Sequence, residues 1–176
     1  MAHEPYKGKF TNLKNPQKYA GDISKITYRS LWERNAFRWL DENPEVKSWA
    51  SEEFSIPYTH PIQGRRAKYF PDLFIEFTNG KVLIVEIKPD KQTREPVQGS
   101  RKTQRYLNEV ATYAVNAEKW KVAQNLAHKN NIEFQIWTEH HLEKLGIPTT
   151  ANTSDKKTKG VKKPKMRNIR RPTRKS

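Results

Sequence analysis

Two acidic residues and a lysine in the middle of the chain have the types and spacing that metal-assisted phosphodiester chemistry requires. Asp72 is followed after thirteen residues by Glu86, and only Ile87 separates Glu86 from Lys88. Two carboxylates can share one cation, and oxygen ligands without thiolates favour Mg²⁺, with Mn²⁺ as the alternative. Such an ion polarises a phosphate and lowers the pKa of a bound water. The lysine would stabilise charge on the phosphate oxygens, or help to orient and deprotonate the water.

Glu86 and Lys88 lie in a segment that is predicted to be a β-strand. Because side chains alternate faces along a strand, both project to the same side, while Leu83, Val85 and Ile87 form an apolar opposite face. An exposed ion pair at a strand end would show the same short pattern. Charges that end an apolar strand seldom serve stability alone, so we expect a functional site.

The position of Asp72 depends on the turn between the two strands, since a shift of one residue moves every side chain to the other face. A two-residue turn would place Ile87 opposite Asp72 and separate the carboxylates. A three-residue loop at 78–80, with Gly80 in the left-handed conformation, places Glu86 opposite Asp72. Cβ atoms of such partners lie about 4.5 to 5.5 Å apart. We predict the three-residue loop, which also gathers one apolar face: Leu73, Ile75, Phe77, Leu83, Val85 and Ile87.

Hydrophobic spacing predicts the elements that hold these strands. Apolar residues recur at helical spacing from about residue 27 to 41, and Asn43-Pro44 ends the helix. A second helical stripe runs from Leu107 to Trp120, with a break expected near Asn116. An extended stretch at 46–49 and 54–58, counted as one strand, is followed by predicted strands at 66–77, 81–88 and 132–137 and by a short helix capped by Thr138. The order α-β-β-β-α-β-α implies an α/β fold with a mixed sheet flanked by helices.

The net charge of +15 is unevenly distributed. Residues 155–176 hold eleven Lys and Arg against one Asp. We therefore predict a flexible basic tail at 149–176, after an N-terminal arm at 1–20 and a folded domain at 21–148. A polyanion such as double-stranded DNA is the partner that this charge favours.

Several classes of protein are excluded or disfavoured. The absence of cysteine excludes disulfides and thiolate zinc sites. The sequence has no Gly-rich phosphate-binding loop, so we expect no nucleotide cofactor. No run approaches the roughly 18 apolar residues of a membrane span, and no apolar signal segment precedes the domain. We expect a soluble protein that is not exported by a signal peptide.

Basic residues bracket the candidate site in the sequence and could position a duplex through its phosphates. Each alone could also be an ordinary solvated charge. The candidates are Arg65, Arg66, Lys68, Lys91, Arg94, Arg101, Lys102 and Arg105, with Lys162, Lys163, Arg170 and Arg171 in the tail.

Phe70-Pro71-Asp72 followed by Glu86-Ile87-Lys88, with Glu33 on a preceding helix, resembles the PD-(D/E)xK nuclease superfamily and, within it, the TnsA-type endonucleases. Further segments are similar to the head completion nucleases of T-even-type bacteriophages: 25–33, 51–53, 66–72 and 87–89 with Gln92-Thr93. The likeness covers roughly residues 7–140.

The resemblance implies a restriction-endonuclease-like core that cleaves DNA with a divalent metal. It implies that Asp72, Glu86 and the Ile87 carbonyl bind the metal, that Lys88 assists hydrolysis, and that Glu33 completes the site. It also implies processing of packaged phage DNA before the tail joins, in the host cytoplasm or the virion, with portal or neck proteins as partners.

Two alternatives stay open. Ser30-Leu31-Trp32-Glu33 matches a capping box, in which Glu33 reaches back to the helix start, whereas a helix that began at Thr27 would free Glu33 for metal. The fold could also serve a structural head or neck protein that binds DNA without cleaving it. RNA is a further conceivable substrate.

Overall fold

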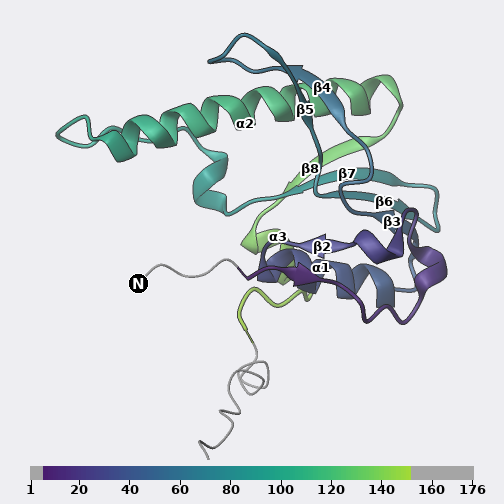
Figure 1. The fold of residues 1–176 in the computed structure, drawn as a ribbon. Helices are drawn as coiled ribbons and strands as arrows, with labels where there is room; N and C mark the ends of the chain where they lie inside the picture. Colours follow the sequence, from purple (N-terminus) through teal and green to yellow (C-terminus); the bar gives the residue numbers. More distant parts are fainter. Residues whose placement is uncertain (1–5, 152–176) are drawn as a thin grey trace, which may run out of the picture.

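A four-stranded mixed sheet lies at the centre of the computed structural model, which describes residues 6–151 (Figure 1). Its strand order is β3-β6-β7-β8, with β3 at Val46–Ala50, β6 at Leu73–Phe77, β7 at Val82–Ile87 and β8 at Glu133–Trp137. The first three strands are antiparallel, and β8 runs parallel to β7. The predicted α/β class with a mixed sheet is confirmed.

The β6–β7 hairpin has the predicted register. Leu73 pairs with Val85, and the backbone N–H of Phe77 donates to the Lys81 carbonyl at 2.8 Å. Gly80 adopts a φ of +87°, a left-handed conformation that favours glycine. The three-residue loop is therefore confirmed. One step beyond the ladder, this register brings Asp72 opposite Glu86.

Helices cover both faces of the sheet (Figure 1). On one face, Leu73, Ile75, Leu83, Val85 and Ile87 pack with residues of α1, at Leu31–Glu42, and of α3, at Glu139–Lys144. On the other face lies α2, at Gln104–Lys129, whose Ala123 packs with Ile56, Tyr58 and Tyr69. The predicted apolar face of the hairpin thus faces α1.

The first helix begins later than predicted. Thr27–Tyr28 forms β2, which pairs with β1 at Gly8–Lys9, and α1 begins at Leu31. The start predicted near residue 27 was wrong because Ser30 caps the helix, its hydroxyl accepting from the Glu33 N–H at 3.1 Å. Two short 3₁₀ helices, η1 at Pro16–Lys18 and η2 at Ile23–Lys25, precede β2. In the segment predicted as an arm, Phe10 and Tyr19 are buried in the core.

The run predicted as one strand at 66–77 is two strands in different sheets. β5, at Arg66–Tyr69, pairs with β4, at Ile56–Thr59, and together they form a separate antiparallel ribbon that packs against α2 (Figure 1). The break falls at Pro71, which has no N–H for a sheet ladder. The single-strand prediction was wrong for this reason.

The second half of the domain follows the predicted order with one correction. After η3, at Asp90–Thr93, α2 is continuous, so the break expected near Asn116 was wrong. Asn116 is buried, and an Asn inside a helix costs less than about 1 kcal/mol, which packing by Trp120 and Ala123 offsets. Thr138 precedes α3 as predicted, although its hydroxyl lies 3.1 Å from His141 Nδ1 instead of capping the helix. Within residues 6–151, no helix has the length and apolar character needed to cross a membrane.

Candidate active site

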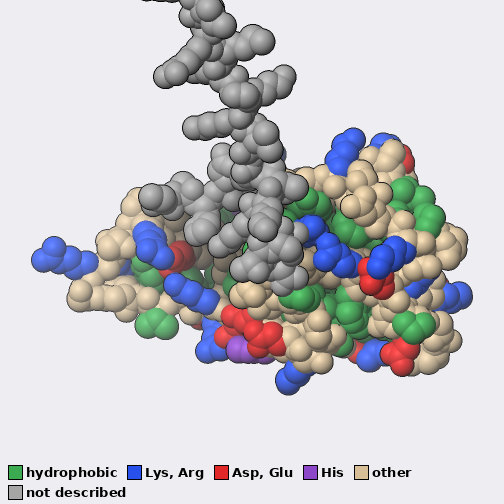
Figure 2. Space-filling model, turned by 90° about the horizontal axis from the view of Figure 1, so that it is seen from below, with side chains coloured by type: hydrophobic (Ala, Val, Ile, Leu, Met, Phe, Trp, Pro, Cys, Tyr) green, Lys and Arg blue, Asp and Glu red, His purple; other side chains and the backbone are tan. Residues whose placement is uncertain are grey.

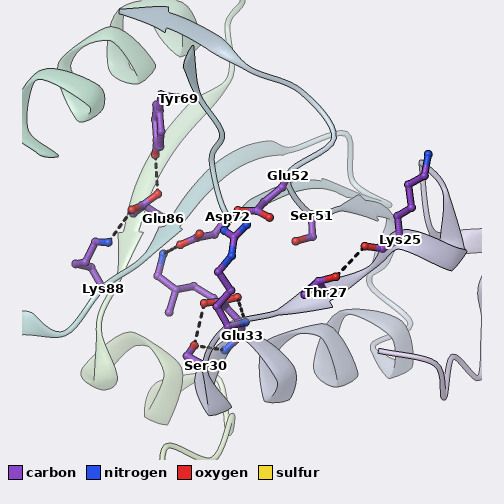
Figure 3. Close-up of polar contacts among 12 residues, drawn as sticks. Lys25, Thr27, Ser30, Glu33, Ser51, Glu52, Tyr69, Asp72, Glu86 and Lys88 are labelled. Atoms are coloured by element: carbon purple, nitrogen blue, oxygen red, sulfur yellow. Dashed lines mark hydrogen bonds and ion pairs between the residues drawn. The ribbon is translucent and has the colours of Figure 1, made fainter. Parts of the chain in front are cut away.

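The predicted trio meets where the β6–β7 hairpin ends, opposite its turn (Figure 3). The backbone N–H of Ile87 donates to Asp72 Oδ2 at 2.7 Å, which joins the two strands through a side chain. Lys88 Nζ lies 3.0 Å from Glu86 Oε1. Glu86 is buried, at 6% exposure, so its charge is balanced within the site. The structure therefore brings Asp72, Glu86 and Lys88 together.

Pro71 determines the hydrogen bonding of the Ile87 carbonyl. Phe77 and Lys81 form a hydrogen-bonded pair, and every second pair along the ladder is of this kind, so Pro71 occupies the position opposite Ile87. Proline cannot donate to the Ile87 carbonyl, and the Ile87 N–H is taken by Asp72 instead. In such a pair the N–H and carbonyl face the same neighbour. The Ile87 carbonyl therefore faces the side on which Asp72 lies.

Tyr69 is a member of the site that sequence reasoning missed. Its hydroxyl donates to Glu86 Oε2 at 2.7 Å, so Glu86 lies between Tyr69 and Lys88 (Figure 3). Burial, and then the negative charge of Glu86, raise the pKa of Tyr69 far above its usual range, so the phenol stays protonated. Nothing in the sequence indicated that β5 would leave the sheet and return over β7, so no signal pointed to this contact.

The negative charge of Glu86 disfavours ionisation of Asp72. Burial raises the pKa of Asp72 well above its ordinary value, and the charge of Glu86 raises it further. The Ile87 N–H and the Lys88 ammonium act in the opposite direction and are smaller effects. A carboxylate in this situation gains from taking up either a proton or a cation. Asp72 and Glu86 are thus suited to bind positive charge.

Glu33 forms the capping arrangement. Its Oε1 accepts from the Ser30 hydroxyl at 3.0 Å and its Oε2 from the Arg29 N–H at 2.8 Å (Figure 3). Burial raises the pKa of Glu33, with a further contribution from the charge of Glu52. Glu33 in turn raises the pKa of Asp72, which places it in the electrostatic range of the site. Its role as a metal ligand stays a prediction, because both oxygens now serve the helix start.

A pocket of about 490 Å³ contains the trio. Among the residues that line it, Lys68 was a predicted DNA contact, whereas Arg29, Glu52, Phe70 and Lys119 were not predicted as site residues. Arg29 and Glu52 form an ion pair, and Glu52 has a φ of 53°, an unusual conformation for a residue other than glycine. The lining consists of Arg29, Glu52, Lys68, Tyr69, Phe70, Asp72, Glu86, Lys88 and Lys119.

The other predicted DNA contacts divide into groups. Arg65 and Arg66 are exposed on the β4–β5 ribbon, next to Lys68. Lys91, Arg94 and Arg105 line a different cavity of about 760 Å³, between η3 and α2, where Arg94 pairs with Asp90 and Arg105 with Glu109. Arg101 and Lys102 are exposed just before α2. Among the predicted contacts within residues 6–151, the structure brings only Lys68 into the candidate site.

On the face that carries α1 and α3, the described residues that are visible form no concentrated basic patch (Figure 2). Figure 2 shows Lys and Arg side chains scattered there among acidic and apolar ones. The predicted contacts Lys162, Lys163, Arg170 and Arg171 lie outside the described residues, as does the predicted tail beyond residue 151.

Comparison with known proteins identifies the class of this domain as a nuclease. The chain belongs to the TnsA-like endonuclease family, because the sequence model of the TnsA-like endonuclease N-terminal domain matches residues 43–139. This range includes Asp72, Glu86 and Lys88 but not Glu33. The chain is also similar to the head completion nuclease of Enterobacteria phage T4, with 46% identity over 146 residues, which cover 81% of this chain and 97% of that protein. The predicted resemblance to TnsA-type endonucleases and to head completion nucleases of T-even-type phages is confirmed.

Proposed function

We propose that this protein is a Mg²⁺-dependent endodeoxyribonuclease of the PD-(D/E)xK type that hydrolyses phosphodiester bonds. The observation that carries the proposal is the register of the β6–β7 hairpin, which brings Asp72 opposite Glu86 and next to Lys88. Membership of an endonuclease family supports the same conclusion.

The residues present fit a hard divalent cation. Asp72, Glu86 and the Ile87 carbonyl would hold it, and all three supply oxygen. Within residues 6–151, no three Asp, Glu, His or Cys side chains are arranged as a metal site, so two carboxylates and a carbonyl are the set to test. Mg²⁺ tolerates such a small set because it retains several waters. When bound, the metal supplies Lewis-acid polarisation of the phosphate and a water of lowered pKa.

Lys88 and Tyr69 each contact a different oxygen of Glu86. Tyr69 keeps Glu86 Oε2 in place through a buried hydrogen bond, and this phenol does not ionise. Lys88 now neutralises Glu86 Oε1. In catalysis the Lys88 ammonium would contact the scissile phosphate and stabilise the charge that develops on its oxygens.

We further propose that the enzyme acts in completion of a phage head, on packaged double-stranded DNA before the tail joins. The similarity to the T4 head completion nuclease, which extends over 97% of that protein, supports this role. Portal or neck proteins would then be its partners, in the host cytoplasm or the virion. The Glu33 carboxylate would join the metal ligands through a lone pair that Ser30 and Arg29 do not use, or by releasing one of these donors.

A structural, DNA-binding head or neck protein is the second candidate function. One observation favours it: both oxygens of Glu86 are already bonded, to Tyr69 and to Lys88, within the site. This protein would bind DNA with a steep dependence on salt but would cleave neither DNA nor RNA with any divalent metal.

Plasmid nicking with Mg²⁺ tests the two candidates. We expect Asp72→Asn, Glu86→Gln and Lys88→Ala each to lower the cleavage rate by about 10² to 10³-fold or more, as for other preorganised charged groups. Lys121→Ala and Glu45→Gln are matched controls, because each removes one exposed charge that is not part of the pocket. Equal cleavage by the Asp72 and Glu45 variants would refute the site. Duplex DNA and RNA of the same sequence identify the substrate class.

A further inference from the structure

Two cations of the pocket, Arg29 and Lys119, were not predicted from the sequence. Lys119, on α2, has no role in the proposed metal site. It lies four residues before Ala123, which is buried against the β4–β5 ribbon, so both occupy the same face of the helix. Lys119 thereby reaches a pocket that Asp72, Glu86 and Lys88 also line, although 30 residues lie between Lys88 and Lys119 in the sequence.

Two phenol rings fix the Lys119 ammonium. Its nitrogen lies 5.8 Å from the ring centre of Tyr58 and 5.7 Å from that of Tyr69, both within the range of cation–π attraction. Tyr69 is itself held by Glu86 through its hydroxyl. The position of the ammonium is thus linked, through one rigid ring, to a proposed metal ligand.

The charge of Lys119 is positioned but not neutralised. In the part of the chain that the structure describes, no carboxylate lies within 4.0 Å of its nitrogen. Of the other cations of the pocket, Lys88 pairs with Glu86 and Arg29 with Glu52. Lys68 resembles Lys119, since no carboxylate of residues 6–151 lies within 4.0 Å of its nitrogen, but Lys68 is not held by aromatic rings in the same way. An aromatic face attracts a cation without cancelling its charge, and the ammonium keeps its donors for another partner.

We infer that Lys119 binds a DNA phosphate adjacent to the scissile one. The inference rests on the proposed function, because it takes DNA as the occupant of the pocket. Asp72, Glu86 and Lys88 occupy one part of the pocket and would take the scissile phosphate. Lys119 sits over Tyr69, on the α2 side of Glu86, and offers a positive charge to the next phosphate of the same strand. Such contacts fix the register of a duplex without reading its sequence.

Binding of duplex DNA in EDTA tests the inference without catalysis. We expect Lys119→Met, which keeps the apolar stem over the tyrosines, to weaken binding about tenfold or more, the scale of a hydrogen bond to a charged group. The slope of log K against log salt should fall by about one unit. Lys119→Arg should keep most of the binding. Lys121→Met is the matched control, since it removes the same charge from an exposed position about 200° further round α2.

Single uncharged methylphosphonates in the duplex locate the contact. One of them should weaken binding by the wild type and lose that effect with Lys119→Met, a result that a merely structural lysine would not give. Equal salt slopes for the Lys119 and Lys121 variants, with no phosphate losing its effect, would overturn the inference. Failure of the wild type to cleave in Mg²⁺ would instead refute the proposed activity, and the binding comparison would still decide the role of Lys119.

Discussion

Asp72→Asn should make the metal-free protein more stable. The hairpin register places Asp72 opposite Glu86, and Cβ atoms of such partners lie about 5 Å apart, which sets the scale for the separation of their charges. At an effective dielectric constant of about 20, two such charges repel by about 3 kcal/mol. The Lys88 ammonium, 3.0 Å from Glu86, offsets part of this repulsion. Asparagine keeps an oxygen that can accept the Ile87 N–H, so we expect a gain on the order of 1 to 2 kcal/mol in the free energy of unfolding at neutral pH.

The sign of the pH dependence follows from the raised pKa of Asp72. The folded state binds the proton of this group more tightly than the unfolded state does, so its ionisation destabilises the fold. The destabilisation is complete above the raised folded-state pKa and disappears below the ordinary value of 3.8. The advantage of the Asn variant over the wild type should therefore shrink as the pH falls towards that value.

Urea unfolding in EDTA and in excess Mg²⁺ measures both effects. Mg²⁺ should stabilise the wild type, by about 2.7 kcal/mol at a hundredfold excess over its Kd, and should stabilise Asp72→Asn much less. Glu45→Gln, near the turn end of the same hairpin, controls for a general effect of removing a negative charge. If Asp72→Asn is no more stable than the wild type in EDTA, or gains as much from Mg²⁺, the two carboxylates do not form a shared cation site.

Three further substitutions test individual contacts. Tyr69→Phe leaves Glu86 Oε2 without its 2.7 Å donor and should cost about 1 to 3 kcal/mol of stability by urea unfolding, while a Mg²⁺ titration of nicking should show a higher metal requirement. Glu33→Gln should cost about 1 kcal/mol, as Ser30→Ala should, and keep cleavage within severalfold; a loss of 10²-fold or more would instead make Glu33 a metal ligand. Gly80→Ala, at a φ of +87°, should lower stability by about 1 kcal/mol in thermal unfolding and leave the nicking rate nearly unchanged.

The hairpin could be predicted because local chemistry and burial select the same register. Gly80 permits the three-residue loop, and that loop places Leu73 and Val85 on the buried face. The ribbon could not be predicted in the same way. Ala67 and Tyr69 share one face and Lys68 lies on the other, just as in a longer strand, so this segment favours the single strand that Pro71 interrupts. Where β5 goes after that interruption depends on packing against α2, a long-range contact with no local signal.

Glu33 presents the opposite difficulty, because two sequence patterns assign different roles to one residue. The apolar spacing predicts a helix that begins before Ser30. The Ser30 hydroxyl instead accepts from the Glu33 N–H and caps the helix at that residue. The same side chain that would complete a metal site then satisfies the helix start. Sequence patterns could name both roles but could not weigh two hydrogen bonds against a metal contact.

Local rules of folding are broken together around the pocket. Asp72 and Glu86 place like charges on neighbouring strands, Pro71 ends a ladder within the hairpin, and Glu52 adopts a left-handed backbone. Each feature costs stability on the order of 1 to 3 kcal/mol if nothing offsets it. Burial of the hairpin against α1 on one face, and of the ribbon against α2 on the other, holds these residues in place. A bound cation would reduce the repulsion between Asp72 and Glu86. It would also be a partner for the Ile87 carbonyl, to which Pro71 cannot donate. The costs of the like charges and of Pro71 would therefore both diminish when the site is occupied.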